Sequence, residues 1–355
     1  MDEELNIRAA IEKIIDQMIT LEDDGSSKDC KYDIVSMNQW EWPQGVALFA
    51  MYQYYSMTGK TEMLAYLIDW FDSHLKKGLP DINVNTTCPM LTLTYLYEET
   101  ENEEYLPYLD QWCDDVMSRM PRTVEQGFQH VTSDFLNDGQ LWDDTLYMTV
   151  LFIARMGVLK KDDKLKEESI RQFLVHLKYL TDTETGLFFH GWDFNGCHNF
   201  ANALWGRGNS WYTAGLVDYL AMIDLQEGVR DYLISTLERQ VQTLGELQDE
   251  SGLWHTILND KETYLETSAS SGFAYGVLKA VREGLLPQKY EKIGLKAVGG
   301  VLQQIDEKGV VHGVSWGTPV FYSLEEYNQV GCRPMPYGQS MALLMLTESL
   351  KHTSL

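Results

Sequence analysis

The chain alternates between two kinds of predicted helix. The first kind carries its apolar residues on one stripe and its charges elsewhere, as a helix with one face in water does. Within residues 162–180, for example, Leu165, Phe173 and Leu177 share such a stripe. The amphipathic segments are 3–20, 61–78, 103–120, 162–180, 230–248 and 288–306.

The second kind of predicted helix is apolar on nearly every face and rich in Gly, Ala, Ser and Thr. A helix of this composition has no side suited to water, so we expect it to be buried all round. These segments are 45–59, 89–100, 144–157, 209–223, 268–284 and 338–350.

Strict alternation of the two kinds, at roughly 45–70 residues per repeat, predicts six helical hairpins. The apolar helices would form an inner ring and the amphipathic helices an outer one, which is an all-α (α/α)6 barrel. A long α-solenoid shares the alternation but does not need such uniformly buried inner helices, so the barrel is favoured. We expect residues 1–355 to form a single barrel domain that carries the catalytic site.

A short motif that ends in histidine precedes four of the predicted inner helices. It occurs at 127–130, 186–190, 252–255 and 309–312, and turn-like acidic residues come before the last three. This pattern indicates short extended hairpins on one rim of the barrel. Because the inner helices begin just after these loops, their polar N-terminal residues should line one cavity.

Charge and cysteine content narrow the classes of function. The net charge is −25, with 53 acidic against 28 basic residues and no basic block, which opposes binding to nucleic acid or to an anionic membrane. No apolar run reaches the ~20 residues that span a bilayer, and the acidic amphipathic N-terminus does not read as a signal peptide, so a cytoplasmic location is expected. Five scattered cysteines without a C-x-x-C pair predict reduced thiols. We predict neither a metal site nor a cofactor.

Candidate chemistry is concentrated at four junctions between loop and inner helix. Each mixes an aromatic ring with a carboxylate, amide or guanidinium, and they lie at 40–45, 140–145, 190–193 and 205–211. Such mixtures suit a carbohydrate, whose apolar ring face stacks on indole while its polar groups need directed hydrogen bonds. We therefore expect Trp42, Trp142, Trp205 and Trp211 to contact substrate.

The adjacent acids Asp143 and Asp144 open the apolar segment 144–157. One helical step turns the chain by ~100°, so the two side chains should face different ways. One acid can then cap the helix or lie in solvent while the other faces the cavity. A cavity Asp beside Trp142 would be partly desolvated, which raises its pKa and makes it a proton donor.

Other polar residues at these junctions have two readings. Arg207 could hold a substrate carboxylate with its planar fork, or it could pair with a nearby acid. His190 and His130 could donate to a sugar oxygen, or they could make structural hydrogen bonds on the rim. His255 and His312 look structural.

Four strings resemble glycoside hydrolase family 105, the unsaturated rhamnogalacturonyl hydrolases. They are HNFANALWGRGNSWY (198–212), HGWD (190–193), QLWDDTLYM (140–148) and NVNTTCPML (83–91), and the likeness covers essentially the whole chain. The resemblance implies the (α/α)6 barrel and places the catalytic acid at Asp144. It also implies that Trp205, Arg207 and Trp211 contact substrate, that His190 binds it, and that Trp42 walls the sugar site.

The resemblance further implies the reaction. Substrates would be short oligosaccharides that carry a 4,5-unsaturated galacturonyl residue at the non-reducing end, typically linked to rhamnose. One Asp would protonate C4 of the enol-ether double bond and activate the water that adds at C5, so a single acid suffices, unlike the usual pair of carboxylates. Two alternatives stay open, namely an unsaturated glucuronyl hydrolase and a noncatalytic carbohydrate-binding barrel.

Overall fold

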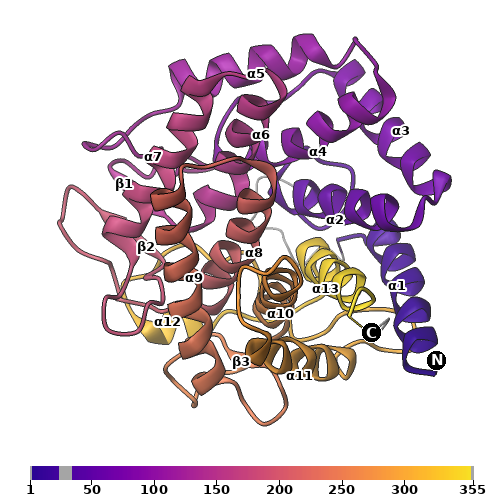
Figure 1. Cartoon of the computed structure of the whole chain (residues 1–355), viewed down its shortest axis with the longest axis vertical. Coiled ribbons are helices and arrows are strands. Elements are labelled where there is room, and N and C mark those ends of the chain that lie inside the picture. The colour runs from indigo at the N-terminus through magenta and orange to yellow at the C-terminus, as the bar shows by residue number, and fades with distance from the viewer. Residues whose placement is uncertain (1, 24–33, 353–355) are drawn as a thin grey trace.

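Two concentric rings of helices make up the computed structural model, which describes residues 2–23 and 34–352. The inner helices surround the centre in Figure 1 and the outer helices surround them. The outer helices are α1 (Asp2–Thr20), α3 (Thr61–Lys77), α5 (Leu106–Arg119), α7 (Asp163–Leu180), α9 (Glu227–Leu247) and α11 (Glu291–Leu302). The inner helices are α2 (Trp42–Thr58), α4 (Val84–Thr100), α6 (Leu151–Leu159), α8 (Gly206–Met222), α10 (Thr267–Arg282) and α13 (Pro336–Ser349).

The inner ring is closed. Each inner helix packs against the next along the chain, and the last, α13, packs against the first, α2. Closure explains why the inner helices are buried all round, since each has two inner neighbours as well as outer helices. The structure is therefore an (α/α)6 barrel, as predicted, and not an open solenoid.

Three local features differ from the prediction. Helix α4 begins at Val84 because Asn83 and Thr86 form a capping box, in which each side chain accepts from the backbone N–H of the other. The segment predicted as one α-helix over 144–157 starts instead as a π-helix, η1 (Leu146–Val150), and continues as α6. Such π-helical turns are frequent at functional sites. A short helix, α12 (Leu324–Asn328), was not predicted.

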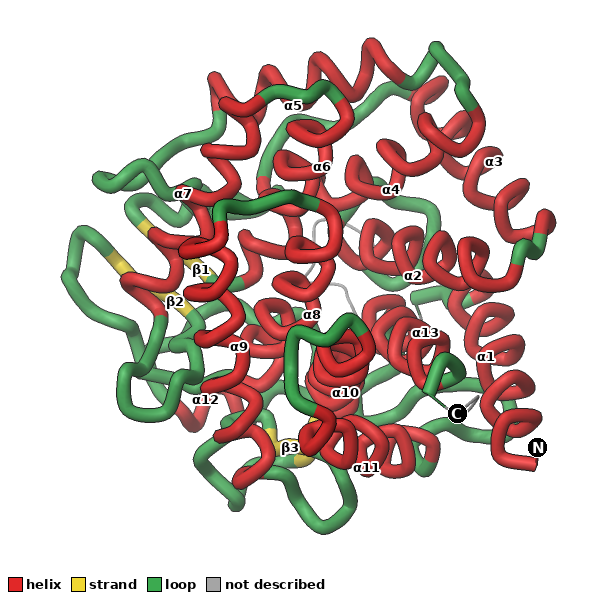
Figure 2. Tube along the Cα trace, in the orientation of Figure 1, coloured by secondary structure: helices red, strands yellow, loops and turns green. Residues whose placement is uncertain are grey.

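Short extended pairs occupy the rim, as the repeated motif predicted, among the loops of Figure 2. Three of the motifs form their own hairpins through the isolated bridges Arg122↔Phe128, Thr181↔Phe188 and Ile305↔Val311. At the fourth, β3 (Trp254–His255) pairs with β4 (Leu265–Glu266). One further pairing joins two different loops, because β1 (Gln140–Trp142) runs antiparallel to β2 (Gly191–Asp193).

Two chemical predictions can be compared with the fold. Within residues 2–23 and 34–352, every helix is too short or too polar to serve as a membrane span. The described cysteines, which are Cys88, Cys113, Cys197 and Cys332, are free thiols as predicted, and Cys30 lies outside the described residues.

Candidate active site

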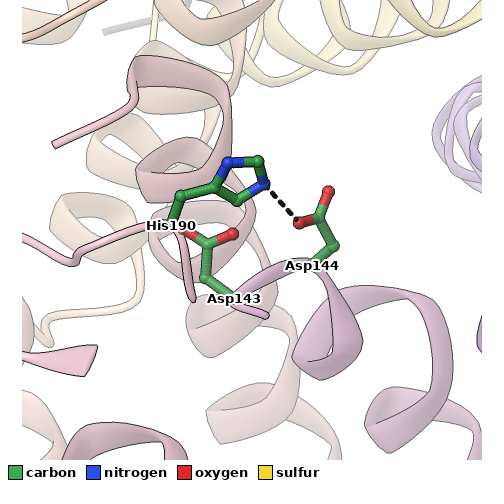
Figure 3. Close-up of side chains that lie close together, drawn as sticks. All are labelled: Asp143, Asp144 and His190. Atoms are coloured by element: carbon green, nitrogen blue, oxygen red, sulfur yellow. Dashed lines mark ion pairs between the residues drawn. The ribbon is translucent and has the colours of Figure 1, made fainter. Parts of the chain in front are cut away.

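The pairing of β1 with β2 brings the two acids beside a histidine that is distant in sequence. Trp142 lies opposite Gly191 in the antiparallel register, and the backbone N–H of Asp143 donates to the carbonyl of His190 at 3.1 Å. The helical turn that follows, directly before η1, carries Asp144 toward the His190 ring (Figure 3). Strand pairing, which sequence spacing did not reveal, thus assembles the acidic centre.

Asp144 faces the imidazole of His190. Its Oδ2 lies 3.4 Å from His190 Nε2, and its side chain is 17% exposed. On the far side of the ring, the Tyr327 hydroxyl lies 2.7 Å from His190 Nδ1 and accepts the Phe321 N–H at 3.2 Å. Because the Asp144 carboxylate can only accept, the tautomer that suits both contacts carries the ring hydrogen on Nε2, beside Asp144, and accepts the Tyr327 hydrogen at Nδ1. A contact of 3.4 Å is long for a hydrogen bond, and such contacts often tighten when substrate binds.

The prediction that burial raises the pKa of Asp144 is wrong. Burial alone does raise the pKa of this carboxyl, but hydrogen bonding and charge from His190, together with the charge of His130, outweigh it, and the net shift is downward. Burial lowers the pKa of His190, so its ring is neutral near pH 7 and acts as a donor. The free site accordingly holds Asp144 as a carboxylate.

Asp143 neither caps a helix nor lies in solvent, so both predicted alternatives for it are wrong. Its side chain is 0% exposed, and its carboxyl interacts with the neighbouring carboxyl of Asp144. The residue before η1 is Thr145, and no side chain caps that helix. Burial, and next the charge of Asp144, raise the pKa of Asp143 well above its usual range. Of the two adjacent acids, Asp143 is therefore the one that holds a proton more tightly.

Asp143, Asp144 and His190 place potential ligand atoms within 4.8 Å of one another, so the cluster is compact enough for a metal ion. To bind a cation, Asp143 would have to release the proton that its raised pKa favours, and His190 would have to present a ring lone pair instead of an N–H.

A cavity of about 200 Å³ opens beside Asp144 on the rim where inner helices begin. Residues from the first turns of α2, α4, η1 and α8 line it, as the sequence predicted. Among the predicted site residues, the cavity is lined by Asp144, Trp42, His130, Trp142, Trp205 and Arg207.

The other two predicted residues lie behind this wall. His190 is buried and touches Asp144 from the rear. Trp211 is 0% exposed, with its ring edge-on to Trp42 at 6.1 Å and tilted against Tyr147 at 4.9 Å. In this structure Trp211 supports the aromatic wall and does not reach the cavity surface.

His130 is held flat against Trp142. The two rings stack with centroids 4.3 Å apart and planes at 13°, and His130 Nδ1 lies 2.8 Å from the Thr145 hydroxyl. Burial lowers the pKa of His130 to about 4, so this ring is also neutral at pH 7. Trp142 is thereby fixed as one face of the cavity.

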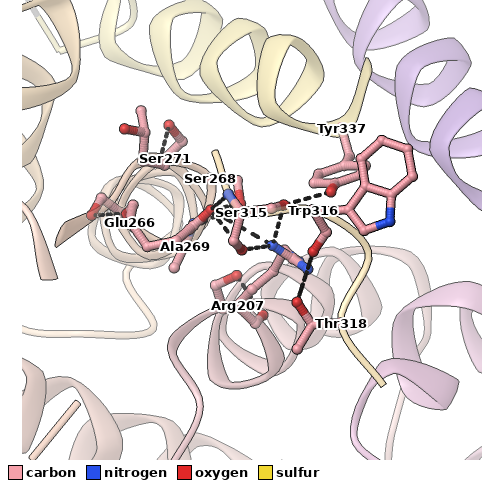
Figure 4. Close-up of polar contacts among 12 residues, drawn as sticks. Arg207, Glu266, Ser268, Ala269, Ser271, Ser315, Trp316, Thr318 and Tyr337 are labelled. Atoms are coloured by element: carbon pink, nitrogen blue, oxygen red, sulfur yellow. Dashed lines mark hydrogen bonds and ion pairs between the residues drawn. The ribbon is translucent and has the colours of Figure 1, made fainter. Parts of the chain in front are cut away.

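Arg207 is almost fully engaged by protein groups (Figure 4). One terminal nitrogen donates to the carbonyl and hydroxyl of Ser315, and the other donates to Trp316 O and to Thr318 Oγ1, each at 3.1 Å. Glu266 is its ion-pair partner at 3.6 Å, which is the second of the two readings of this arginine. The guanidinium also stacks on Trp205 at 4.5 Å. Its Nε atom has no partner, and the side chain is 1% exposed.

The residues that Arg207 holds form one wall of the cavity, and the sequence analysis did not find them. Trp316, Gly317, Thr318 and Pro319 line the cavity from a loop that leads to α12. We call residues 315–319 the strap. Its aromatic residue, Trp316, lies next to a Gly and a Thr but without the carboxylate, amide or guanidinium that marked the four junctions, so that signal could not find it.

Glu41 is a second missed residue, although it lies within one of the four junctions. It lines the cavity, is 4% exposed and accepts a hydrogen bond from Ser133 Oγ, which itself accepts from Asn83 Nδ2 at 3.0 Å. Burial raises the pKa of Glu41 to about 7, with a smaller contribution from the charge of Asp134. The cavity therefore contains a carboxyl that titrates near neutrality.

An (α/α)6 barrel that opens at one rim into a tryptophan-walled cavity with a reactive carboxyl pair has the fold and site of a glycosidase. The chain belongs to Glycosyl Hydrolase Family 88, whose family model matches residues 10–353.

Two proteins that are similar to this chain in sequence or in structure support this assignment. The chain is 34% identical to the unsaturated rhamnogalacturonyl hydrolase YesR of Bacillus subtilis, over 88% of this chain and 90% of YesR. A crystal structure described as a possible member of family GH105, from Salmonella enterica serovar Paratyphi A, has 44% identity and a TM-score of 0.95. The match covers 98% of this chain and 94% of that one. The resemblance to family 105 is thereby confirmed.

A more distant neighbour supports the fold alone. The unsaturated glucuronyl hydrolase of Bacillus sp. GL1 superposes with a TM-score of 0.73 at 15% identity, covering 97% of this chain and 96% of that one. The barrel is thus common to enzymes whose sequences have diverged widely.

Proposed function

We propose that this protein removes the 4,5-unsaturated galacturonyl residue from the non-reducing end of rhamnogalacturonan-derived oligosaccharides. The observation that carries the proposal is the position of Asp144, a carboxylate on the wall of an aromatic cavity whose Oδ2 lies 3.4 Å from His190 Nε2. Family membership and the likeness to YesR support the same activity.

Asp144 is the general acid and base of the proposed reaction. In its protonated form it delivers a proton to C4 of the enol-ether double bond, and positive charge develops at C5 and the ring oxygen. The resulting Asp144 carboxylate then accepts a proton from the water whose oxygen adds at C5. The hemiketal formed in this way opens and releases the rest of the oligosaccharide. His190 orients the carboxylate through its N–H during these steps.

The cavity wall holds the ring in place. Trp42, Trp142 and Trp205 offer apolar faces for stacking, and His130 keeps Trp142 in position. We propose that Arg207 contributes to binding of the uronate carboxylate, through its unpaired Nε and through the strap that it fixes.

The test is the loss of ultraviolet absorbance from unsaturated galacturonyl-rhamnose. Asp144→Asn should lower kcat by at least about a hundredfold, because general acid–base catalysis typically contributes 10²–10⁴-fold. Asp69→Asn is the matched control, since it removes the same charge from an exposed position on the outer helix α3. Turnover by Asp144→Asn at the wild-type rate would refute the assignment of the acid.

Two alternatives are separated by the same assay. Faster turnover of an unsaturated glucuronyl disaccharide than of unsaturated galacturonyl-rhamnose would identify a glucuronyl hydrolase. Binding without turnover of either substrate would identify a noncatalytic barrel.

We also propose that the chain acts as a single catalytic domain located in the cytoplasm. The closed ring, which uses helices from α1 to α13, supports the first point. The free thiols support the second, since reducing compartments keep cysteines unpaired.

A further inference from the structure

Asp143 is a carboxyl that is sealed from solvent and interacts with the side chain of Asp144. It is 0% exposed, and the charge and the side chain of Asp144 both act on it. An isolated buried carboxylate is so costly that the group takes up a proton instead. Nothing in the proposed reaction so far uses this acid, although it is a direct neighbour of Asp144.

The protein provides a specific space for this carboxyl. Gly208, in the first turn of α8, lies against it, and a Cβ at position 208 would collide with the Asp143 carboxyl group. The backbone of Asp143 is fixed by His190 O, which accepts its N–H at 3.1 Å, and by Leu146, whose N–H donates to Asp143 O at 3.3 Å. The carboxyl therefore lies beside the first turn of α8, where the helix carries partial positive charge.

The groups around the acid pair leave few other sources of a proton. His130 and His190 are neutral near pH 7, because burial lowers the pKa of each. Burial raises the pKa of the Tyr327 hydroxyl, and its hydrogen is committed to His190. Arg207, on α8, is always charged and is paired with Glu266. Among the described cavity residues, Glu41 is the other carboxyl that takes up a proton near neutrality.

We propose that Asp143 stores the proton that Asp144 delivers to the substrate. In the resting protein Asp143 carries the proton and Asp144 is ionised. Entry of the anionic uronate places a negative charge near Asp144 and raises its affinity for a proton, which moves from the Asp143 oxygen to the Asp144 oxygen. The dipole of α8 stabilises Asp143 while it is ionised.

The proton balance closes over one turnover. Asp144 gives its proton to C4 and regains one from the water that adds at C5, so the double bond gains one hydrogen and one hydroxyl. When product leaves, the proton returns to Asp143. The pair thus begins and ends with a single proton, and Asp143 is a positioning residue that acts through Asp144. This inference rests on the proposed function.

Asp143→Asn tests the proposal, because asparagine has the shape of a protonated carboxyl but cannot release a proton. We expect kcat on unsaturated galacturonyl-rhamnose to fall at least about tenfold, with KM nearly unchanged and the pH profile of kcat altered. If Asp143 only fills space as a neutral group, the isosteric variant will keep the wild-type kcat and pH profile, and the proposal is overturned.

A second measurement needs no turnover. In substrate-free protein carrying Glu41→Gln, infrared spectroscopy near pH 7 should show the C=O band of a buried protonated carboxyl. That band should disappear on adding Asp143→Asn and persist on adding Asp144→Asn. Absence of the band in the Glu41→Gln protein overturns the proposal even if Asp143→Asn fails to fold. Failure of the proposed function is recognised separately, because the wild type would then turn over neither unsaturated substrate or would turn over the glucuronyl disaccharide faster.

Discussion

Glu41 should make the stability of this protein depend on pH. Its carboxyl is 4% exposed, and burial raises its pKa from 4.5 to about 7. The folded protein therefore holds a proton that the unfolded chain releases once the pH exceeds 4.5. By linkage, Glu41 does not affect the free energy of unfolding below that pH. The free energy of unfolding then falls as the pH rises toward about 7 and stays lowered above it. The raised pKa of Glu41 corresponds to a loss of ~3 kcal/mol in the free energy of unfolding.

Glu41→Gln should remove this deficit. The glutamine carbonyl can still accept the hydrogen bond from Ser133, so the packing of the site is retained. We expect the free energy of unfolding of the variant to match the wild type near pH 4. It should exceed the wild-type value by up to ~3 kcal/mol at about pH 8. Because Glu41 lines the cavity, its charge should also raise the wild-type KM for the anionic substrate above about pH 7, and the variant should lack this rise.

The assay is equilibrium unfolding in urea, followed by tryptophan fluorescence at several values from about pH 4 to 8. Glu62→Gln, on the first turn of the outer helix α3, is the control for loss of an exposed glutamate. A stability difference between Glu41→Gln and wild type that stays constant over this pH range would refute the reasoning, because it would mean that Glu41 has the same pKa in both states.

Two further changes test the supports of the site. Tyr327→Phe removes the hydroxyl that lies 2.7 Å from His190 Nδ1 and accepts the Phe321 N–H, so the His190 ring can adopt either tautomer. We expect kcat to fall about tenfold and the free energy of unfolding to fall by about 1–3 kcal/mol, because two groups lose their partner, and an unchanged kcat would show that the hydroxyl does not set the tautomer. Arg207→Lys removes the planar guanidinium that donates to Ser315 and Trp316. The free energy of unfolding, measured by calorimetry, should fall by about 2–4 kcal/mol, and steady-state kinetics should show KM raised more than kcat is lowered. A variant as stable as wild type would contradict the role of Arg207 as anchor of the strap.

The helices and their two rings could be predicted because the information is local. The apolar residues of segment 162–180 lie on one stripe of the helix, whereas those of 209–223 lie on nearly every face. This distribution indicates how much of each helix surface must be buried. The alternation then leaves a closed double ring as the arrangement that buries every apolar face. The position of the cavity followed from the loops before the inner helices.

The chemistry of individual side chains could be predicted only in part. Sequence placed Asp144 at the cavity, but the direction of its pKa shift depends on His190, which β1–β2 pairing brings alongside. The partners of Arg207 in the strap come from more than a hundred residues later in the chain. Tyr327, on α12, contacts His190 from a still more distant segment. No local pattern encodes such contacts.

The opening of the predicted helix at 144–157 shows where the two kinds of information divide. The sequence by itself determined that two acids precede a buried apolar segment, and it predicted unequal roles for them because one helical step turns the chain by ~100°. Only the tertiary structure decided that Asp143 is the one sealed against Gly208 and that Asp144 is the one facing His190 and the cavity. The physical reason is that solvation and charge, which set the protonation of a carboxyl, depend on every neighbour within a few ångströms regardless of its place in the chain.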